Sequence, residues 1–252
     1  MLLRGLLVFT FTLLLLFQFN IPTAAQSGAS PVSLSFDFRN GALGWKAGFS
    51  DYPPATNTSG FYELRAGMSN LPPEISMSDR GYAIQGNNHS DDLFMFIKRR
   101  LGIAEGIVPG QAYEVSFDIV FASNAGKGCV GAGGAPGEGV TLKVGAASFE
   151  PRALIDRSDP HRFRRMNVDK GDQSKGGEDA SAAGNIANGK PCVSPQPYVS
   201  IRRIRRHPTP VVANSNGEVW LLIGTDSGFE GSTRIYFQRI NVTLVPVDQA
   251  TP

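Results

Sequence analysis

An all-β fold, built as an antiparallel sandwich of two sheets, is predicted first by the composition of the 252-residue sequence and by the alternation of its side chains. The chain has 29 Gly, 17 Pro and 16 Phe, a composition that favours many short strands joined by turns over a helical bundle. In residues 113–122 every second side chain, at 113, 115, 117, 119 and 121, is apolar, and Glu114, Ser116 and Asp118 lie between them. A strand with one buried and one wetter face requires this alternation, because successive side chains point to opposite sides of a sheet.

The expected strands are runs of apolar and β-branched residues bounded by turn residues. They are 33–38, 61–65, 82–85, 93–98, 113–122, 140–144, 218–224 and 234–245. Residues 219–223 show no alternation, which predicts a central strand buried on both faces. Eight such strands are enough for two facing sheets in a single domain over 26–252.

The first 25 residues have the pattern of an export signal. Arg4 precedes the apolar run Gly5–Phe17, and the small residues Thr23-Ala24-Ala25 stand before Gln26. A membrane anchor is the alternative, but a span needs about 20 apolar residues and polar residues follow Phe17. We therefore expect a secreted or periplasmic protein, with no membrane span after removal of residues 1–25.

Cys129 and Cys192 are the only two cysteines, so one intramolecular pairing exists. In an exported chain we expect them to form a disulfide, with two free buried thiols as the alternative. CxxC spacing is absent, so zinc and redox motifs have no support.

Residues 150–210 interrupt the strand pattern and are rich in charge, Gly, Ser, Asn and Pro. We interpret this segment as a long, loop-rich insertion. Between residues 152 and 207 it has 12 Lys or Arg against 6 Asp or Glu. It is therefore basic, whereas the remainder of the chain is acidic.

Arginines dominate this basic segment, at positions 162, 164, 165, 202, 203, 205 and 206, and residues 98–100 add a third basic cluster. Their planar guanidinium groups suit carboxylates, sulfates and phosphates. No nucleic acid is expected, because the chain without its signal has a net charge of only +1. An acidic glycan or an anionic surface polymer is the favoured partner, and solvated strand faces are the alternative.

Three segments resemble the galactose-binding-like, jelly-roll carbohydrate-binding modules. Phe36–Trp45 is similar to their opening strand and Gly-Trp turn, Val108–Ile119 to their central segment, and Arg234–Leu244 to their closing strand. The resemblance implies a jelly-roll sandwich. Acidic residues in the closing strand of many such modules help hold calcium, but this chain has Gln238-Arg239 there. No metal is expected, and no cofactor.

Two polar loops, 86–92 and 225–231, are the first candidate binding site. They supply carboxylates, amides and an imidazole, on residues Asn88, His89, Asp91, Asp92, Asp226 and Glu230. The two loops form one site only if they meet at the same end of the sandwich. The alternative is that these residues simply make turns.

Aromatic residues around 45–62 are the second candidate. Trp45, Phe49, Tyr52 and Tyr62 lie close in sequence and would form a platform on which a sugar ring stacks. Burial of Trp45 in the core is the alternative.

Non-catalytic recognition of a carbohydrate or cell-envelope polymer is the function that these features favour. A jelly-roll polysaccharide lyase or hydrolase is a competing hypothesis, since Tyr62-Glu-Leu-Arg65 faintly resembles an alginate-lyase motif. The Gln-Ile/Val-His motif that would accompany it is missing, and loss of activity in His89→Ala would test this hypothesis. No Gly-x-Ser-x-Gly elbow or complete phosphate loop is present, and no catalytic residue is assigned. A surface structural or adhesive protein is the third hypothesis.

Overall fold

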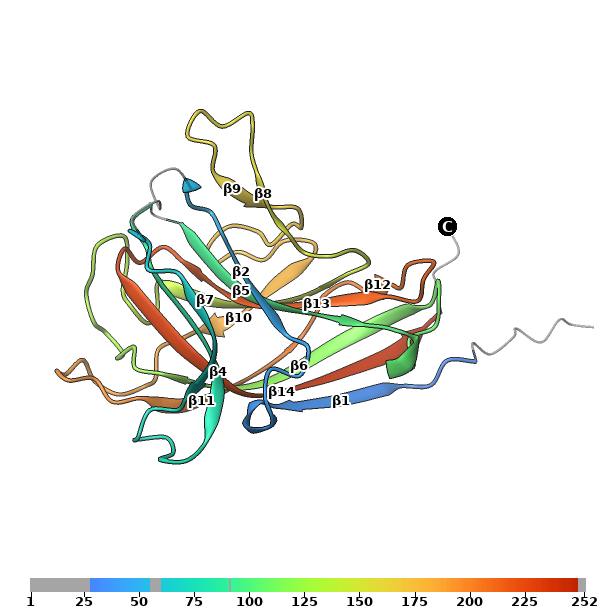
Figure 1. Ribbon diagram of the computed structural model, residues 1–252, viewed down its shortest axis with the longest axis horizontal. Helices are drawn as coiled ribbons and strands as arrows, with labels where there is room; N and C mark the ends of the chain where they lie inside the picture. The colour runs from blue at the N-terminus through green and yellow to red at the C-terminus, as the bar shows by residue number, and fades with distance from the viewer. Residues whose placement is uncertain (1–27, 55–59, 91, 249–252) are drawn as a thin grey trace, which may run out of the picture.

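The computed structural model describes residues 28–54, 60–90 and 92–248, and this part of the chain is nearly all β (Figure 1). The expected export signal, 1–25, lies outside the described residues. Every pairing between the described strands is antiparallel, as predicted. Among the described residues, no helix has the length and apolar character needed to span a bilayer.

Two large sheets form the sandwich. The seven-stranded sheet consists of β1 (Val32–Asp37), β3 (Arg65–Asn70), β4 (Arg80–Asn87), β6 (Ala112–Ser123), β11 (Val199–Arg206), β12 (Val211–Val212) and β14 (Ser232–Val247). The five-stranded sheet has the order β10 (Ala180–Asn185), β7 (Val140–Ala147), β13 (Val219–Ser227), β5 (Leu93–Leu101) and β2 (Lys46–Ser50). Consecutive strands β4 to β7 alternate between the two sheets, so the described chain forms a jelly-roll sandwich.

Short elements complete the fold. Strands β8 (Ala153–Ile155) and β9 (Arg164–Met166) form a hairpin on the far side of the five-stranded sheet, as Figure 1 shows. Two 3₁₀ turns are η1 (Phe38–Asn40) and η3 (Ile103–Glu105).

The core lies between the facing sheets and follows the predicted alternation. In β6 the side chains at 113, 115, 117, 119 and 121 are all buried, with exposures of 0 to 1%. They contact the inward residues of β13, which is buried on both faces as expected for 219–223.

Seven of the eight expected runs coincide with observed strands, and two of them, 33–38 and 218–224, extend one residue beyond the strand. The exception is 61–65, where the prediction was wrong: the chain turns, with Glu63 at φ +48° and its N–H donating to Gly60 O. Strand β3 therefore begins only at Arg65.

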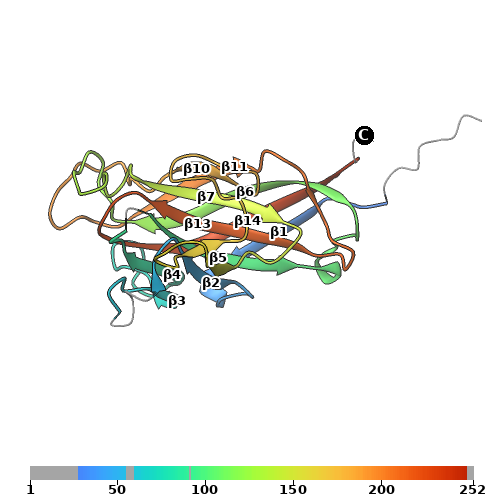
Figure 2. The ribbon, with the colours of Figure 1, turned by 90° about the horizontal axis from the view of Figure 1, so that it is seen from above.

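The segment 150–210 contains more structure than a loop-rich insertion implies. It contributes β10 and β11, which form one long edge of the sandwich in Figure 2, while β2 and β3 lie at the opposite edge. The sequence of β10, Ala-Ser-Ala-Ala-Gly-Asn, has little β propensity, and it is held by pairing to β7.

The same segment also covers an apolar patch on the outer face of the five-stranded sheet. Phe94, Phe96 and Leu222 point outward from that sheet and pack against Val168 and Ala180. Residues 150–180 thus cover this face of the sheet, and we call them the roof segment.

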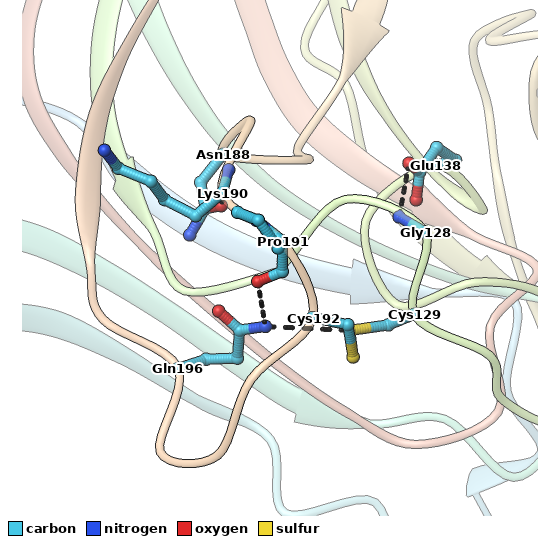
Figure 3. Close-up of a disulfide and its surroundings, with 8 residues drawn as sticks. All are labelled: Gly128, Cys129, Glu138, Asn188, Lys190, Pro191, Cys192 and Gln196. Carbon is cyan, nitrogen blue, oxygen red and sulfur yellow. Dashed lines mark hydrogen bonds between the residues drawn. A yellow bond between two sulfur atoms is a disulfide. The ribbon is translucent and has the colours of Figure 1, made fainter.

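Cys129 and Cys192 form a disulfide, as expected, with their Cα atoms 5.2 Å apart. It joins the loop after β6 to the loop before β11, and Figure 3 shows Gln196 beside it, donating from Nε2 to Pro191 O. Lys127 N–H donates to Lys190 O close by. The disulfide therefore fastens the loop between β10 and β11 to the loop that follows β6.

Candidate site: a charged cluster beside a basic groove

The two polar loops meet at one end of the sandwich. Asn88 N–H donates to Gly231 O at 3.0 Å, and its side-chain Nδ2 donates to Ser227 O and Phe229 O. Asn88 is 1% exposed, so its amide joins the loops and is not presented to a ligand.

Beneath the roof segment lies a group of six ionisable side chains, which we call the charged cluster. Its members are Asp51, Asp92, Lys143, Arg165, Lys170 and Asp226. One carboxylate oxygen from each of the three aspartates lies within 4.8 Å of the other two.

Lys170 lies between these carboxylates. Its Nζ is 2.9 Å from Asp226 Oδ2, 3.2 Å from Asp51 Oδ2 and 4.0 Å from Asp92 Oδ1. Burial works against its charged form, but the three carboxylates outweigh burial and raise the pKa of Lys170 above its usual range. The Lys170 ammonium is therefore the cation that lies between the side chains of Asp51, Asp92 and Asp226.

Asp92 differs from its two partners in protonation. Burial, and next the charge of Asp226, raise the pKa of Asp92 to about 8, although Lys170 opposes the shift. The surroundings of Asp92 therefore favour its protonated form more than those of an exposed aspartate do. Among the described residues, neither Asp92 Oδ1 nor Asp226 Oδ1 has a hydrogen-bond partner.

Lys143 enters the cluster from β7, and its side chain is 0% exposed. Its Nζ is 3.1 Å from Asp226 Oδ2 and donates to the backbone carbonyls of Lys170 and Lys175. Burial lowers the pKa of Lys143, although Asp226 opposes this. At the outer rim, Arg165 Nη1 lies 3.0 Å from Asp51 Oδ1 and links the cluster to solvent.

A groove of about 480 Å³ opens next to this rim, between β2, β5 and the β8–β9 hairpin. We call it the basic groove. It is lined by Gly48, Phe49, Tyr52, Phe96, Lys98, Glu150, Arg152, Ala153, Leu154 and Arg164.

Three cationic side chains converge on the basic groove, against one carboxylate. Glu150 pairs with Lys98 at 2.8 Å and with Arg152 at 2.5 Å. The Arg164 side chain makes one hydrogen bond within the described residues, to Ala153 O at 3.4 Å. Most of the five N–H donors of Arg164 are therefore not engaged by the described protein.

At the bottom of the basic groove the Gly48 backbone covers the buried ring of Phe96. A Cβ placed on Gly48 would lie 2.3 Å from Phe96 Cζ, so the Gly48 backbone rests directly on the Phe96 ring. Tyr52 borders this part of the groove, and its backbone oxygen accepts a hydrogen bond from Arg164 N–H, while Asp51 N–H donates to Arg164 O.

The remaining predicted site residues do not gather in one place. Trp45 is 3% exposed and packs on Phe36 in the core, and the aromatic platform is therefore not formed by Trp45. The ring of His89 stacks on Phe61, with centroids 3.9 Å apart. Glu230 is exposed, and Asp91 lies outside the described residues.

Asp51, Lys143, Arg165 and Lys170 were not singled out from the sequence for this cluster. One signal was available for Lys143, since a lysine stands among apolar residues in the run Val140–Ala147 and is fully buried there. Asp51, Arg165 and Lys170 lie in turns or in the roof segment, where charged residues are common.

No family model matches this chain, and no curated protein matches it. Solved structures to which it is similar include a family 27 carbohydrate-binding module of Caldicellulosiruptor saccharolyticus in complex with mannohexaose. That match has 11% identity, a TM-score of 0.37, and covers 86% of this chain and 98% of the module.

Two further structures share the same extent of overlap. A family 11 carbohydrate-binding module from Clostridium thermocellum has 10% identity and a TM-score of 0.32, covering 89% of this chain and 100% of the module. An adhesin domain of Lys-gingipain from Porphyromonas gingivalis has 10% identity and a TM-score of 0.32, covering 87% and 99%. At such low identities and TM-scores, no ligand is transferred from these proteins to this chain.

Proposed function

We propose that the protein is an exported, non-catalytic recognition protein whose basic groove binds an acidic carbohydrate polymer of a cell envelope. The observation that supports this most is the convergence of Lys98, Arg152 and Arg164 on one open groove with a single carboxylate. Jelly-roll sandwiches host many functions, so the proposal depends on this groove and not on the fold.

The charges of the groove favour an anionic ligand. Glu150 offsets one of the three cations, which leaves a local excess of two positive charges. Arg152 is 61% exposed, and while its Nε and Nη2 contact Glu150 Oε2, the planar guanidinium has further N–H donors for a bound carboxylate or sulfate. Charge-assisted hydrogen bonds of this type are about twice as strong as neutral ones.

The apolar residues of the groove favour a sugar over a small inorganic anion. Phe49 and Leu154 present apolar surface in the groove, Leu154 being 52% exposed, and the charged side chains lie around them. An acidic pyranose has the matching pattern, because its ring has an apolar face and its charge lies at the edge. Ligand sites in proteins commonly combine an apolar lining with a few placed polar groups.

The test is affinity for an acidic polysaccharide, measured for the mature protein on heparin and on polygalacturonate as a function of salt. Wild type is expected to be retained at low salt and released as salt screens the charges. Arg164→Ala should weaken binding about tenfold, the effect of losing one charge-assisted hydrogen bond of about 1.4 kcal/mol.

Arg205→Ala on β11 is the matched control, because Arg205 is an exposed arginine on the seven-stranded sheet and should leave affinity unchanged. Equal losses in both variants would assign binding to the β11 edge. Absence of binding by wild type at low salt would reject the proposal, and release of unsaturated sugars would favour the lyase hypothesis.

A further inference from the structure

The deepest ionic contact of the charged cluster joins two neighbouring strands. Lys143 on β7 and Asp226 on β13 lie on the same outer face of the five-stranded sheet, one diagonal step apart in the register. Both side chains are 0% exposed, and Lys143 Nζ is 3.1 Å from Asp226 Oδ2. This pair is closed to solvent and takes no part in the basic groove.

The surroundings of the pair are unusual for a salt bridge that merely holds strands together. Asp226 Oδ2 has a second ammonium partner, Lys170, at 2.9 Å, whereas Asp226 Oδ1 has no partner among the described residues. Asp92, whose surroundings favour its protonated form, is close enough to interact with Asp226. The amine, the carboxyl group and an adjacent acid are therefore assembled without an external substrate.

The environment also favours a neutral product. Phe94, Ala180 and Leu222 form an apolar patch on this sheet face, and the Lys170 ammonium lies 5.3 Å from the Phe94 ring centroid. Each buried ion carries a desolvation penalty that its partner only partly offsets. An amide formed from the ammonium and the carboxylate is uncharged, and the water released leaves the apolar site.

We propose that Lys143 and Asp226 form an intramolecular amide bond that covalently joins β7 to β13. The bond forms between Lys143 Nζ and Asp226 Cγ, and the bond from Cγ to Oδ1 breaks. The product is one amide and one water, so no oxidant, reductant or other reactant is required.

The neighbouring side chains have defined roles in this reaction. Transfer of a proton from the Lys143 ammonium to the Asp226 carboxylate leaves a nucleophilic amine and a carboxylic acid. Lys170 donates to Asp226 Oδ2 and stabilises the negative charge that develops there during attack. Asp92 delivers a proton to Oδ1 as it leaves, and takes one from Nζ, so it ends unchanged.

Lys143 and not Lys170 is the nucleophile. Lys170 also lies 3.2 Å from Asp51, and the surrounding carboxylates hold it as an ammonium, which has no free electron pair. Lys143 has one carboxylate partner within the described residues, and its burial disfavours the charged form.

Intact mass spectrometry of the mature, disulfide-bonded protein tests the proposal. The expected mass is lower than that of the oxidised sequence by one water molecule. Digestion should yield a branched peptide that contains both Lys143 and Asp226. A wild-type mass equal to that of the oxidised sequence would overturn the proposal.

Three variants assign the bond to these residues. Lys143→Arg keeps the positive charge but cannot form the amide, so its mass should equal that of its oxidised sequence. Asp92→Asn removes the acid that transfers the protons, so the form that has not lost water should accumulate. Lys98→Arg changes a lysine paired with Glu150 in the groove and should lose water as wild type does. Loss of water in Lys143→Arg would contradict the assignment, and if that variant fails to fold, the branched peptide of wild type still decides.

Discussion

Lys170 Nζ lies 2.9 Å from Asp226 Oδ2, although the lysine belongs to the roof segment and the aspartate to the central strand β13. Both side chains are buried, with exposures of 8% and 0%. The contact ties the roof to the sheet at a point where the roof also covers Phe94 and Leu222. An ionic interaction thus fixes the position of a segment whose sequence has little apolar content.

Replacement of this lysine should strongly destabilise the fold. Lys170→Met removes one of the two cationic partners of the buried Asp51 carboxylate, together with the ammonium next to Asp226 Oδ2, and breaking a buried pair costs about 3–5 kcal/mol. Urea unfolding measures the change. Lys127→Met, at an exposed lysine, should stay within about 0.5 kcal/mol of wild type; a similarly small change for Lys170→Met would mean that the cluster is solvated.

The disulfide should contribute to stability chiefly by restricting the unfolded chain. Cys129 and Cys192 are 63 residues apart, and closing a loop of this length is worth about 4 kcal/mol in the chain-entropy model. The Cys129→Ser, Cys192→Ser double variant should lose a stability of that size in guanidinium unfolding. Wild type treated with reductant should match the double variant, and a difference below about 1 kcal/mol would contradict the loop argument.

His207 should make the protein less stable at acidic pH. The side chain is 2% exposed, and burial lowers the pKa of His207 below its usual value, although Asp179 opposes the shift. The unfolded chain therefore binds more protons than the folded one below about pH 6.5, and stability falls as the pH drops through this range.

The His207→Gln variant isolates this effect. Its stability difference from wild type should be largest near about pH 7.5 and shrink by about pH 5.5, because only wild type has a buried imidazole to protonate. Melting temperatures of both proteins across this range give the difference. A constant difference would show that His207 does not titrate differently in the folded and unfolded states.

Trp45 should matter for stability and not for ligand binding. Its ring contacts Phe36 and Phe38 in the core, and truncation of a buried tryptophan to alanine costs about 3–5 kcal/mol. Trp45→Phe should cost less and keep wild-type retention on polygalacturonate. Loss of retention in a folded Trp45→Phe protein would restore Trp45 as part of the binding surface.

Period-two alternation was sufficient to predict the strands that line the core, because burial between two sheets imposes it on β6 and β14 directly. It failed for β10, whose small residues acquire strand structure only by pairing with β7. It also failed at Glu63, where a positive φ ends the extended conformation.

The candidate site was predictable only in part. Asp92 and Asp226 lie in two polar loops whose meeting could be proposed from the sequence, and Asn88 joins these loops. Lys170 and Arg164 come from the roof segment, and nothing in its sequence specifies which face of the sandwich it covers. Their roles depend on tertiary packing between distant parts of the chain.

Nuclear magnetic resonance titration of the mature, isotopically labelled protein with a uronate oligosaccharide tests binding at the basic groove most directly. We predict salt-sensitive shifts of the Gly48, Ala153 and Leu154 amides, which border the groove, with Arg203 and Arg205 on β11 unaffected. Shifts confined to β11, or no shifts at low salt, would contradict the proposed function.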